Sequence, residues 1–469
     1  MNTKNLLIAL FCLLALNFQA IRAKDPDALK KFLSKKELAH AAVSLKAVDL
    51  ATGKVIVSHN ENMSLTPASN MKLVTTATAI ETLGDSFRYE TPIVYDGYIR
   101  NDTLFGDIFV KGVGDPSLGS EYVGDGPDAL FEAWSKSVTD AGIRYIEGDI
   151  VVLDQLFGYE GVSPKWMLED LGWYYGSPIY GVSVFDNMCR IYLKSGPAGS
   201  KPEVLRVKPY IDNLEIVNQL TVTDSTVNSS EIFGYPFANE RFLKGAVAAG
   251  RENIVFEGDI PDPGAVLADY FYKSLLLKGV KIAGKATTFR VAQVLPKTEK
   301  PLYVHRSPDL RTLVREINLH SNNNFTEYFF KLLRQSYNLN IPEYWTSKGL
   351  DASALQMYDG SGLSPINAVS SGFLIELLIY MDKKYGRDGA YFQSLPVAGK
   401  EGTVASFLRN TPLAGKAHLK SGSITGVQSF SGYVEIGSKR YAVSFLVNNF
   451  SGKRTDLRKA MEELLVGLF

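Results

Sequence analysis

The amino-acid sequence predicts an α+β protein in which both ends of the chain build one domain around a largely β insertion. Helix-like and hairpin-like segments occupy both ends, whereas short β-like runs broken by Gly, Asp and Asn fill the middle, from about residue 90 to 261. With 469 residues, 45% of them hydrophobic and 21% charged, the chain is globular in composition and longer than one core usually supports. We therefore expect a main domain over residues 24–93 and 262–469, and an inserted region of two small subdomains over 94–261.

The first 23 residues have the layout of a signal peptide. Lys4 precedes an almost continuous apolar run over Leu6–Leu16, and the segment ends in the small residue Ala23. An uncleaved anchor is the alternative, but the apolar run is short for a bilayer span. We therefore expect export to the periplasm, and peripheral membrane association stays open.

Charge and cysteine content exclude several classes of protein. Fifty basic residues balance fifty acidic ones, so there is no electrostatic case for nucleic-acid binding. If the signal peptide is removed, Cys189 is the one remaining cysteine, which excludes an internal disulfide and a Cys-based zinc site. We expect no metal and no cofactor.

The N-terminal part reads as a helix, a hairpin and a second helix. Asp27–His40 is helix-like, and Ala41–Leu50 and Lys54–Ser58 alternate around a Gly-containing turn. The next helix begins near Ser69, and its apolar residues recur at a spacing near 3.6: Leu73, Val74, Ala77, Ile80 and Leu83.

The remaining segments follow in the same way. The β-like runs of the middle region are Ile93–Tyr95, Leu104–Lys111, Ile150–Leu153, Arg190–Leu193 and Ile254–Glu257. Helical patterns return at Ala265–Lys278, Leu310–Asn318, Phe325–Tyr337 and Ser370–Lys384. A hairpin of Ser431–Ile436 and Arg440–Asn448 and a helix over Asp456–Leu468 close the chain.

Ser69-Asn70-Met71-Lys72 is the one Ser-x-x-Lys in the sequence, and it opens a predicted helix. Residues three apart share a helix face, so the Ser69 hydroxyl and the Lys72 amine can lie side by side. A lysine shielded from water can take the proton of a serine and activate it as a nucleophile. Taken alone, the motif also fits an ordinary helix start with a surface lysine.

Two further triplets carry suitable chemistry. Ser321-Asn322-Asn323 lies between two predicted helices, where its hydroxyl and amide could relay a proton and hold a substrate amide. The alternative is helix capping, with Asn324 and Glu327 as a capping box.

Lys420-Ser421-Gly422, followed by Ser423, precedes the closing hairpin. Its amine and hydroxyl suit a carboxylate, and its glycine lets the backbone of a ligand approach the strand.

Two tripeptides elsewhere in the sequence have the same residue types as two of these motifs, so the order of the motifs and the predicted elements around them must be considered. These tripeptides are Lys194-Ser195-Gly196 and Ser58-His59-Asn60. They do not fit the order of helix start, loop between helices and sheet strand in which Ser69, Ser321 and Lys420 occur. A Ser-His-Asp triad is disfavoured, because there are only five histidines and no Gly-x-Ser-x-Gly elbow. Asp115 and Asp359 lie in Gly-rich stretches and are expected to form turns.

The three motifs in this order resemble the signature of the penicillin-recognising serine enzymes. The large insertion between the first two narrows the resemblance to class C low-molecular-mass penicillin-binding proteins, the D-alanyl-D-alanine carboxypeptidase/endopeptidase family. Gly114–Leu118, Asp359–Ser364 and Leu395–Gly399 with Gly402-Thr403 also look like that family. The resemblance implies a β-lactamase/transpeptidase-like domain, an antiparallel sheet flanked by helices.

The resemblance also implies roles for the catalytic residues. Ser69 would attack the carbonyl of the penultimate D-alanine and form an acyl-enzyme, and Lys72 would accept its proton. Burial and the positive charge of Lys420 are expected to lower the pKa of Lys72. Ser321 would pass the proton to the leaving D-alanine, and Asn323 would orient Lys72 and the substrate amide.

For substrate binding, the resemblance implies that Lys420 and Ser421 hold the terminal carboxylate, with Gly422 beside the substrate. The backbone N–H groups of Ser69 and Ser423 would form the oxyanion hole. The expected partners are peptidoglycan stem peptides, with β-lactams as inhibitors. A β-lactamase or esterase on the same scaffold and a non-catalytic cell-wall scaffold protein are the alternatives, and the oligomeric state stays open.

Overall fold

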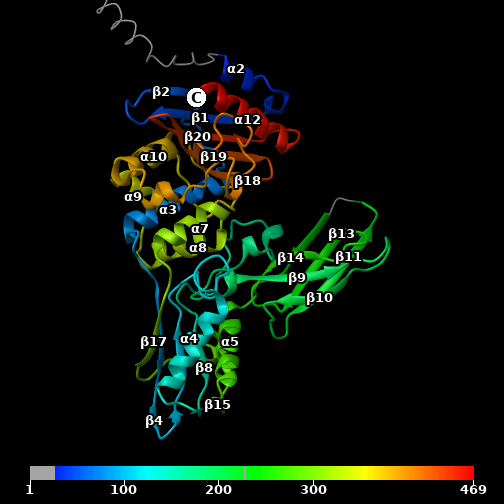
Figure 1. Ribbon diagram of the computed structural model, residues 1–469, viewed down its shortest axis with the longest axis vertical. Coiled ribbons are helices and arrows are strands. Elements are labelled where there is room, and N and C mark those ends of the chain that lie inside the picture. The colour runs from blue at the N-terminus through cyan, green and yellow to red at the C-terminus, as the bar shows by residue number, and fades with distance from the viewer. Residues whose placement is uncertain (1–26, 226–228) are drawn as a thin grey trace, which may run out of the picture.

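The computed structural model describes residues 27–225 and 229–469. Figure 1 shows an elongated molecule in which the two ends of the described chain, from residue 27 and up to residue 469, lie in one body, while the segments between them extend away from it. The expected signal peptide, residues 1–23, lies outside the described residues. Within the described ranges, none of the helices has the length and apolar character needed to cross a membrane.

The main body is built on an antiparallel sheet made from both ends of the chain. Within the described residues, this sheet has five strands in the order β18-β19-β20-β1-β2. N-terminal β1 pairs with C-terminal β20 along its whole length, so the α+β fold and both predicted hairpins are confirmed. The strands are β1 (Ala42–Asp49), β2 (Val55–His59), β18 (Ala417–Ile424), β19 (Val427–Ile436) and β20 (Lys439–Asn448).

Helices cover both faces of this sheet. Successive side chains of a strand point to opposite faces, and apolar side chains lie on both. Val43 and Leu45 of β1 pack in a core with α2 (Ala28–Leu33) and α12 (Arg454–Leu468). Val48 joins a second core on the other face. That second core contains α3 (Met71–Leu83), α7 (Leu310–His320), α8 (Asn323–Lys331), α9 (Ile341–Ser347), α10 (Ser371–Tyr385) and α11 (Ala390–Ser394).

Two predicted helices are shorter in the structure. The helix expected over Asp27–His40 ends at Leu33, and a 3₁₀ turn over Lys36–Leu38 follows. The helix expected to reach Tyr337 is α-helical only to Lys331, where a π-helical turn continues it.

The segment between α3 and α7 forms sheets of its own. In the described residues, one sheet runs β16-β8-β6-β3-β17 and another β15-β7-β5-β4, with α4 (Gly126–Asp140) and α5 (Pro263–Leu277) packed in the same core. Their strands are β3 (Glu90–Tyr95), β4 (Tyr98–Arg100), β5 (Thr103–Phe105), β6 (Ile108–Lys111), β7 (Tyr145–Ile146), β8 (Ile150–Leu153), β15 (Lys281–Ile282), β16 (Ala286–Thr288) and β17 (Lys300–Arg306). The short helix α6 (Phe289–Ala292) follows β16.

A second group of strands branches off beside the first (Figure 1). Over the described ranges it forms two three-stranded sheets, β10-β9-β14 and β11-β13-β12. The strands are β9 (Met188–Lys194), β10 (Glu203–Lys208), β11 (Glu215–Thr223), β12 (Ser229–Phe233), β13 (Glu240–Ala248) and β14 (Ile254–Asp259). The predicted domain bounds stay a prediction, but pairing of β17 with β3 extends the insertion's hydrogen bonding to Arg306.

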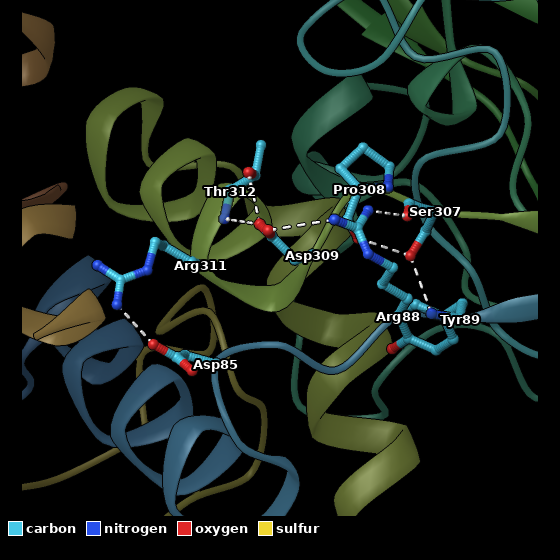
Figure 2. Close-up of polar contacts among 8 residues, drawn as sticks. All are labelled: Asp85, Arg88, Tyr89, Ser307, Pro308, Asp309, Arg311 and Thr312. Atoms are coloured by element: carbon cyan, nitrogen blue, oxygen red, sulfur yellow. Dashed lines mark hydrogen bonds and ion pairs between the residues drawn. The ribbon is translucent and has the colours of Figure 1, made fainter.

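The chain leaves and re-enters the main body at one place, drawn in Figure 2. The outgoing Tyr89 N–H donates to the Ser307 hydroxyl at 2.9 Å, and Arg88 donates to the Ser307 carbonyl at 2.8 Å. The Arg311 guanidinium forms an ion pair with Asp85 at 2.6 Å.

Asp309, at the same crossing, begins the helix that leads to the site. Its carboxylate accepts the backbone N–H of Thr312 at 3.0 Å and so caps α7. It also pairs with Arg88 at 3.3 Å, again as Figure 2 shows. The crossing therefore fixes the start of α7, and Ser321 lies directly after the other end of that helix.

Candidate active site

Ser69 lies in a 3₁₀ turn, Ala68–Asn70, that leads directly into α3. The preceding Ala68 is fully buried and has a φ of 47°, a conformation that is unusual for a residue with a side chain. Backbone strain of this kind persists where the surrounding structure imposes it, often at functional sites. The turn leads into the helix that the sequence predicted near Ser69, and it leaves Ser69 half-buried.

Lys72, one turn further along the chain, is fully buried and surrounded by oxygen atoms. Its Nζ lies 3.0 Å from Ser69 Oγ, 2.6 Å from Asn323 Oδ1 and 2.7 Å from the carbonyl oxygen of Ser361. The amide and carbonyl oxygens can only accept hydrogen bonds. A neutral Lys72 amine would therefore donate to these two oxygens and direct its lone pair at the Ser69 hydroxyl, the arrangement that a general base requires.

Burial lowers the pKa of Lys72 to about 7, while the carboxylates of Glu327 and Asp359 act in the opposite direction. The sequence led us to expect burial and the charge of Lys420 as joint causes. Burial is confirmed as the main cause, and the carboxylates of Glu327 and Asp359 oppose it, which the sequence did not indicate. Lys72 and Lys420 do interact, because the charge of Lys72 contributes to the lowered pKa of Lys420. An uncharged amine is thus available near neutral pH.

Ser321 ends α7 in the left-handed conformation, with a φ of 60°. Its hydroxyl accepts a hydrogen bond from Lys420 Nζ at 2.9 Å. The next residue, Asn322, caps α8 through its side chain, which accepts the N–H of Phe325 at 3.0 Å. The predicted capping box of Asn324 and Glu327 is therefore wrong, because the cap lies two residues earlier.

Asn323 links the main body to the inserted region. Its Oδ1 contacts Lys72, and its Nδ2 donates to the carbonyl oxygen of Tyr175 at 2.9 Å. These bonds hold the amide group at the junction of two parts of the molecule.

Lys420 and Ser421 come from β18, the edge strand of the main sheet. Lys420 is fully buried, and burial together with the charge of Lys72 lowers its pKa well below the ordinary value. The Ser421 hydroxyl donates to the Thr403 hydroxyl at 2.7 Å. An amine and two hydroxyl groups thus lie along one strand edge, a set that suits an anionic group.

Gly422 allows β18 to pass against the turn that carries Ser69. A Cβ placed on Gly422 would lie 2.5 Å from the Pro67 carbonyl oxygen and 2.9 Å from the Ser69 backbone nitrogen. Both distances are shorter than a van der Waals contact, so only glycine fits. Ser423 follows with an exposed side chain at the same strand edge.

We expect Gly422→Ala to slow acylation of Ser69 by about 100-fold, because a shift of about 1 Å at a reacting atom costs that much. The new methyl group would displace the Ser69 backbone, since the atoms it meets include main chain. The rate of covalent labelling by a fluorescent penicillin measures the effect.

The matched control is Gly196→Ala in the imitating triplet Lys194-Ser195-Gly196. There the new Cβ meets only the Ser200 side chain, at 3.0 Å or more. The control should label at the wild-type rate, and an equal loss in both variants would contradict the role given to Gly422.

Sequence reasoning missed three groups at this site. The carbonyls of Tyr175 and Ser361 and the buried carboxylate of Glu327 all come from segments far from Ser69 in sequence. The stretch Asp359–Ser364 was noticed as a turn and as part of the family resemblance, but not as a source of contacts to Lys72. Asp359 does form one, accepting the N–H groups of Gly362 and Ser364 at 2.8 and 2.5 Å.

The predicted residues therefore converge in a single cluster: Ser69, Lys72, Ser321, Asn323, Lys420, Ser421, Gly422 and Ser423. The imitating Lys194 instead pairs with Glu252 in an exposed salt bridge. Among residues 27–225 and 229–469, His, Cys, Asp and Glu side chains form no group of three or more that could hold a metal ion. The cluster has the parts of a serine nucleophile with an amine base.

Comparison with known proteins places this arrangement in context. Residues 26–467 match the model of the D-Ala-D-Ala carboxypeptidase 3 (S13) family. A D-alanyl-D-alanine carboxypeptidase of Actinomadura sp. strain R39 is 27% identical over 455 residues, covering 92% of this chain and 81% of that protein. The crystal structure of penicillin binding protein 4 from Haemophilus influenzae superposes with a TM-score of 0.79 at 21% identity, covering 93% of this chain and 97% of the other.

Proposed function

Because the chain belongs to the D-Ala-D-Ala carboxypeptidase 3 (S13) family, we propose that it is a serine-type D-Ala-D-Ala carboxypeptidase that acts on peptidoglycan stem peptides. The observation that carries this proposal is the position of the buried Lys72 amine, 3.0 Å from Ser69 Oγ. An uncharged amine there can take the proton of the serine and make it a nucleophile. The relative from Actinomadura sp. strain R39, which matches 92% of this chain, is named a D-alanyl-D-alanine carboxypeptidase, and this supports the same reaction.

In the proposed acylation step, each residue of the cluster has one role. Ser69 attacks the carbonyl carbon of the penultimate D-alanine while Lys72 takes its proton, and the backbone N–H groups of Ser69 and Ser423 stabilise the oxyanion. The proton then reaches the leaving amine through the Ser321 hydroxyl, which lies 2.9 Å from Lys420 Nζ. Collapse of the tetrahedral intermediate releases D-alanine and leaves an ester on Ser69.

Substrate binding and deacylation use the same cluster. Lys420, with the linked hydroxyls of Ser421 and Thr403, binds the terminal carboxylate of the substrate. The Asn323 amide, held between Lys72 and the inserted region, orients the peptide. Water then attacks the ester, and the serine is restored. The same steps would cut D-alanyl cross-links between stem peptides, a DD-endopeptidase activity.

The proposed inhibitors and location follow from this chemistry. β-Lactams resemble the D-alanyl-D-alanine end and should acylate Ser69; the Haemophilus influenzae protein has also been solved in complex with a β-lactam. The substrate lies in the cell wall, so we place the enzyme in the periplasm, with residues 1–23 as its signal peptide. The β-lactamase alternative predicts rapid loss of the adduct, whereas the carboxypeptidase predicts a persistent one.

The direct test uses a synthetic stem pentapeptide that ends in D-Ala-D-Ala. We expect the wild-type protein to release the terminal D-alanine, measured by chromatography, and to leave a peptide ending in D-Ala-L-Ala intact. A protein that releases nothing from the first peptide and also forms no adduct with penicillin would contradict the proposed function.

A further inference from the structure

Glu327 is a buried carboxylate that the proposed reaction does not use. It lies four residues after Asn323 on α8, so the two side chains share a helix face. Only 4% of its surface is exposed. Since α8 is capped by Asn322, Glu327 has no capping role, and burial of an acidic group at this depth requires specific partners.

Those partners are two consecutive backbone N–H groups. Glu327 Oε1 accepts the Ser361 N–H at 2.6 Å and the Gly360 N–H at 3.0 Å. The carbonyl of Ser361, in turn, contacts Lys72 Nζ at 2.7 Å. One short segment therefore connects the carboxylate of Glu327 to the amine of Lys72.

The segment has little freedom to adopt another position. A Cβ on Gly360 would lie 2.5 Å from Phe330 Cβ, and one on Gly362 would lie 1.8 Å from the carbonyl oxygen of Ala68, the residue before the nucleophile. The Thr75 hydroxyl also donates to the Gly360 carbonyl at 2.8 Å. A change in the position of this segment would therefore move Lys72 relative to Ser69.

The charges around Glu327 come from each element packed against it. Lys72 of α3 and Lys420 of β18 are the buried cations of the site, and Asp359 lies in the segment that Glu327 holds. Lys331 lies one turn further along α8 and donates to the main-chain carbonyl of Glu160 at 3.0 Å. Burial raises the pKa of Glu327, Asp359 adds to that effect, and the ionised carboxylate in turn raises the pKa of Lys72.

Glu327 also lines a cleft of about 340 Å³ together with Trp166, Lys331 and Tyr358. The residues lining this cleft do not include Ser69, Lys72, Ser321 or Lys420. Glu327 therefore borders a cleft whose lining is distinct from the catalytic residues.

We propose that Glu327 is a positioning residue for acylation: its carboxylate holds the Gly360–Ser361 peptide that binds the Lys72 amine, and its negative charge, when present, favours the protonated form of that amine. The inference rests on the proposed function, because it assigns Lys72 as the base. Glu327 thus acts through two properties, the length of its side chain and its negative charge. A different substitution removes each of them.

Glu327→Gln tests the charge, because an amide oxygen can still accept the same N–H groups. Without the negative charge, protonated Lys72 is less stable, so its pKa falls and the acid limb of the acylation rate should move about half a unit to lower pH, since Glu327 and Lys72 titrate in the same interval. Burial raises the pKa of Glu327 to about 7, so much of the wild-type carboxylate is already uncharged at pH 6, and the gain in the fraction of the plateau rate there should be less than about twofold. The measurement is the labelling rate with fluorescent penicillin from pH 5 to 9.

Glu327→Asp tests the reach, because it keeps the charge on a shorter side chain. We expect its plateau rate to fall about tenfold or more while the acid limb stays near the wild-type position. Glu160→Gln is the matched control: it removes an exposed carboxylate from the same cleft but keeps the main-chain bond to Lys331, and its profile should equal that of wild type.

Thermal unfolding of every variant checks folding, and the aspartate variant still tests the proposal if the glutamine variant does not fold. An unshifted acid limb in a folded Glu327→Gln protein overturns the charge effect, and a wild-type plateau in Glu327→Asp overturns the positioning effect. A wild-type protein that is not acylated at all would instead contradict the proposed function, so the two failures are distinguishable.

Discussion

Ser69→Ala is expected to reduce penicillin labelling and D-alanine release by about 10⁴-fold or more, because removing a nucleophile costs nearly the whole advantage of covalent catalysis. Alanine keeps the backbone of the turn and removes only the hydroxyl that contacts Lys72. The half-buried side chain fills no core position, so the stability of the fold should hardly change. The loss should therefore appear in the rate and not in Tm.

Mass spectrometry of the penicillin-treated protein is the sharpest measurement, because it locates the adduct on a peptide. Wild type should carry one adduct on the peptide that contains Ser69. Ser64→Ala is the matched control, since this exposed serine, five residues earlier, donates to the Ala354 carbonyl at 3.2 Å and lies outside the catalytic cluster defined above. An adduct on another peptide, or undiminished labelling of Ser69→Ala, would remove the basis of the proposed mechanism.

How much of this site could be predicted depends on how local each contact is. Ser69 and Lys72 are three residues apart on a helix start, so their contact follows from helix geometry alone. Convergence with Ser321 and Lys420 cannot be deduced from spacing, because it depends on how distant segments pack. It was predicted from the order of the motifs and from the family resemblance that they carry.

The main sheet was predictable for a similar reason. Its hairpins are marked by alternation and by glycine-containing turns, which are local signals. That β1 and β20 pair with each other is a long-range outcome, which alternation within each hairpin does not indicate. The four further sheets of the described insertion show less clearly in the sequence, because their strands are short and many are two to six residues long.

Glu327 shows where sequence reasoning failed and why. Three residues after Asn324 it matches a capping box, a purely local pattern. The structure places the cap at Asn322 and turns Glu327 inward to the backbone of residues 360–361. Its partners are more than thirty residues away in sequence, and a turn of Gly and Ser gives no sign of which carboxylate will bind its N–H groups.

Lys72→Met is expected to lower the acylation rate by about 10³-fold, the loss associated with removing a general base. Methionine matches the length and burial of the lysine chain but has no amine, so no group remains to take the proton of Ser69. The oxygens of Asn323 and Ser361 lose a donor, which costs some stability, while the variant no longer buries an ionisable group. A rate loss of this size corresponds to about 4 kcal/mol in the barrier, more than we expect in stability.

The pH profile separates a lost base from a distorted site. With a pKa of about 7, Lys72 is mostly protonated at pH 6 and mostly neutral at pH 8, so wild-type acylation should rise through that interval. In Lys72→Met the residual rate should be independent of pH there, because the titrating group is absent. Lys46→Met serves as the control: this lysine is half-buried, and its amine pairs with Glu61 at 3.0 Å and not with Ser69. If Lys72→Met kept the rise near pH 7, the base would have to be another group, and the chemistry assigned to the pair of Ser69 and Lys72 would be wrong.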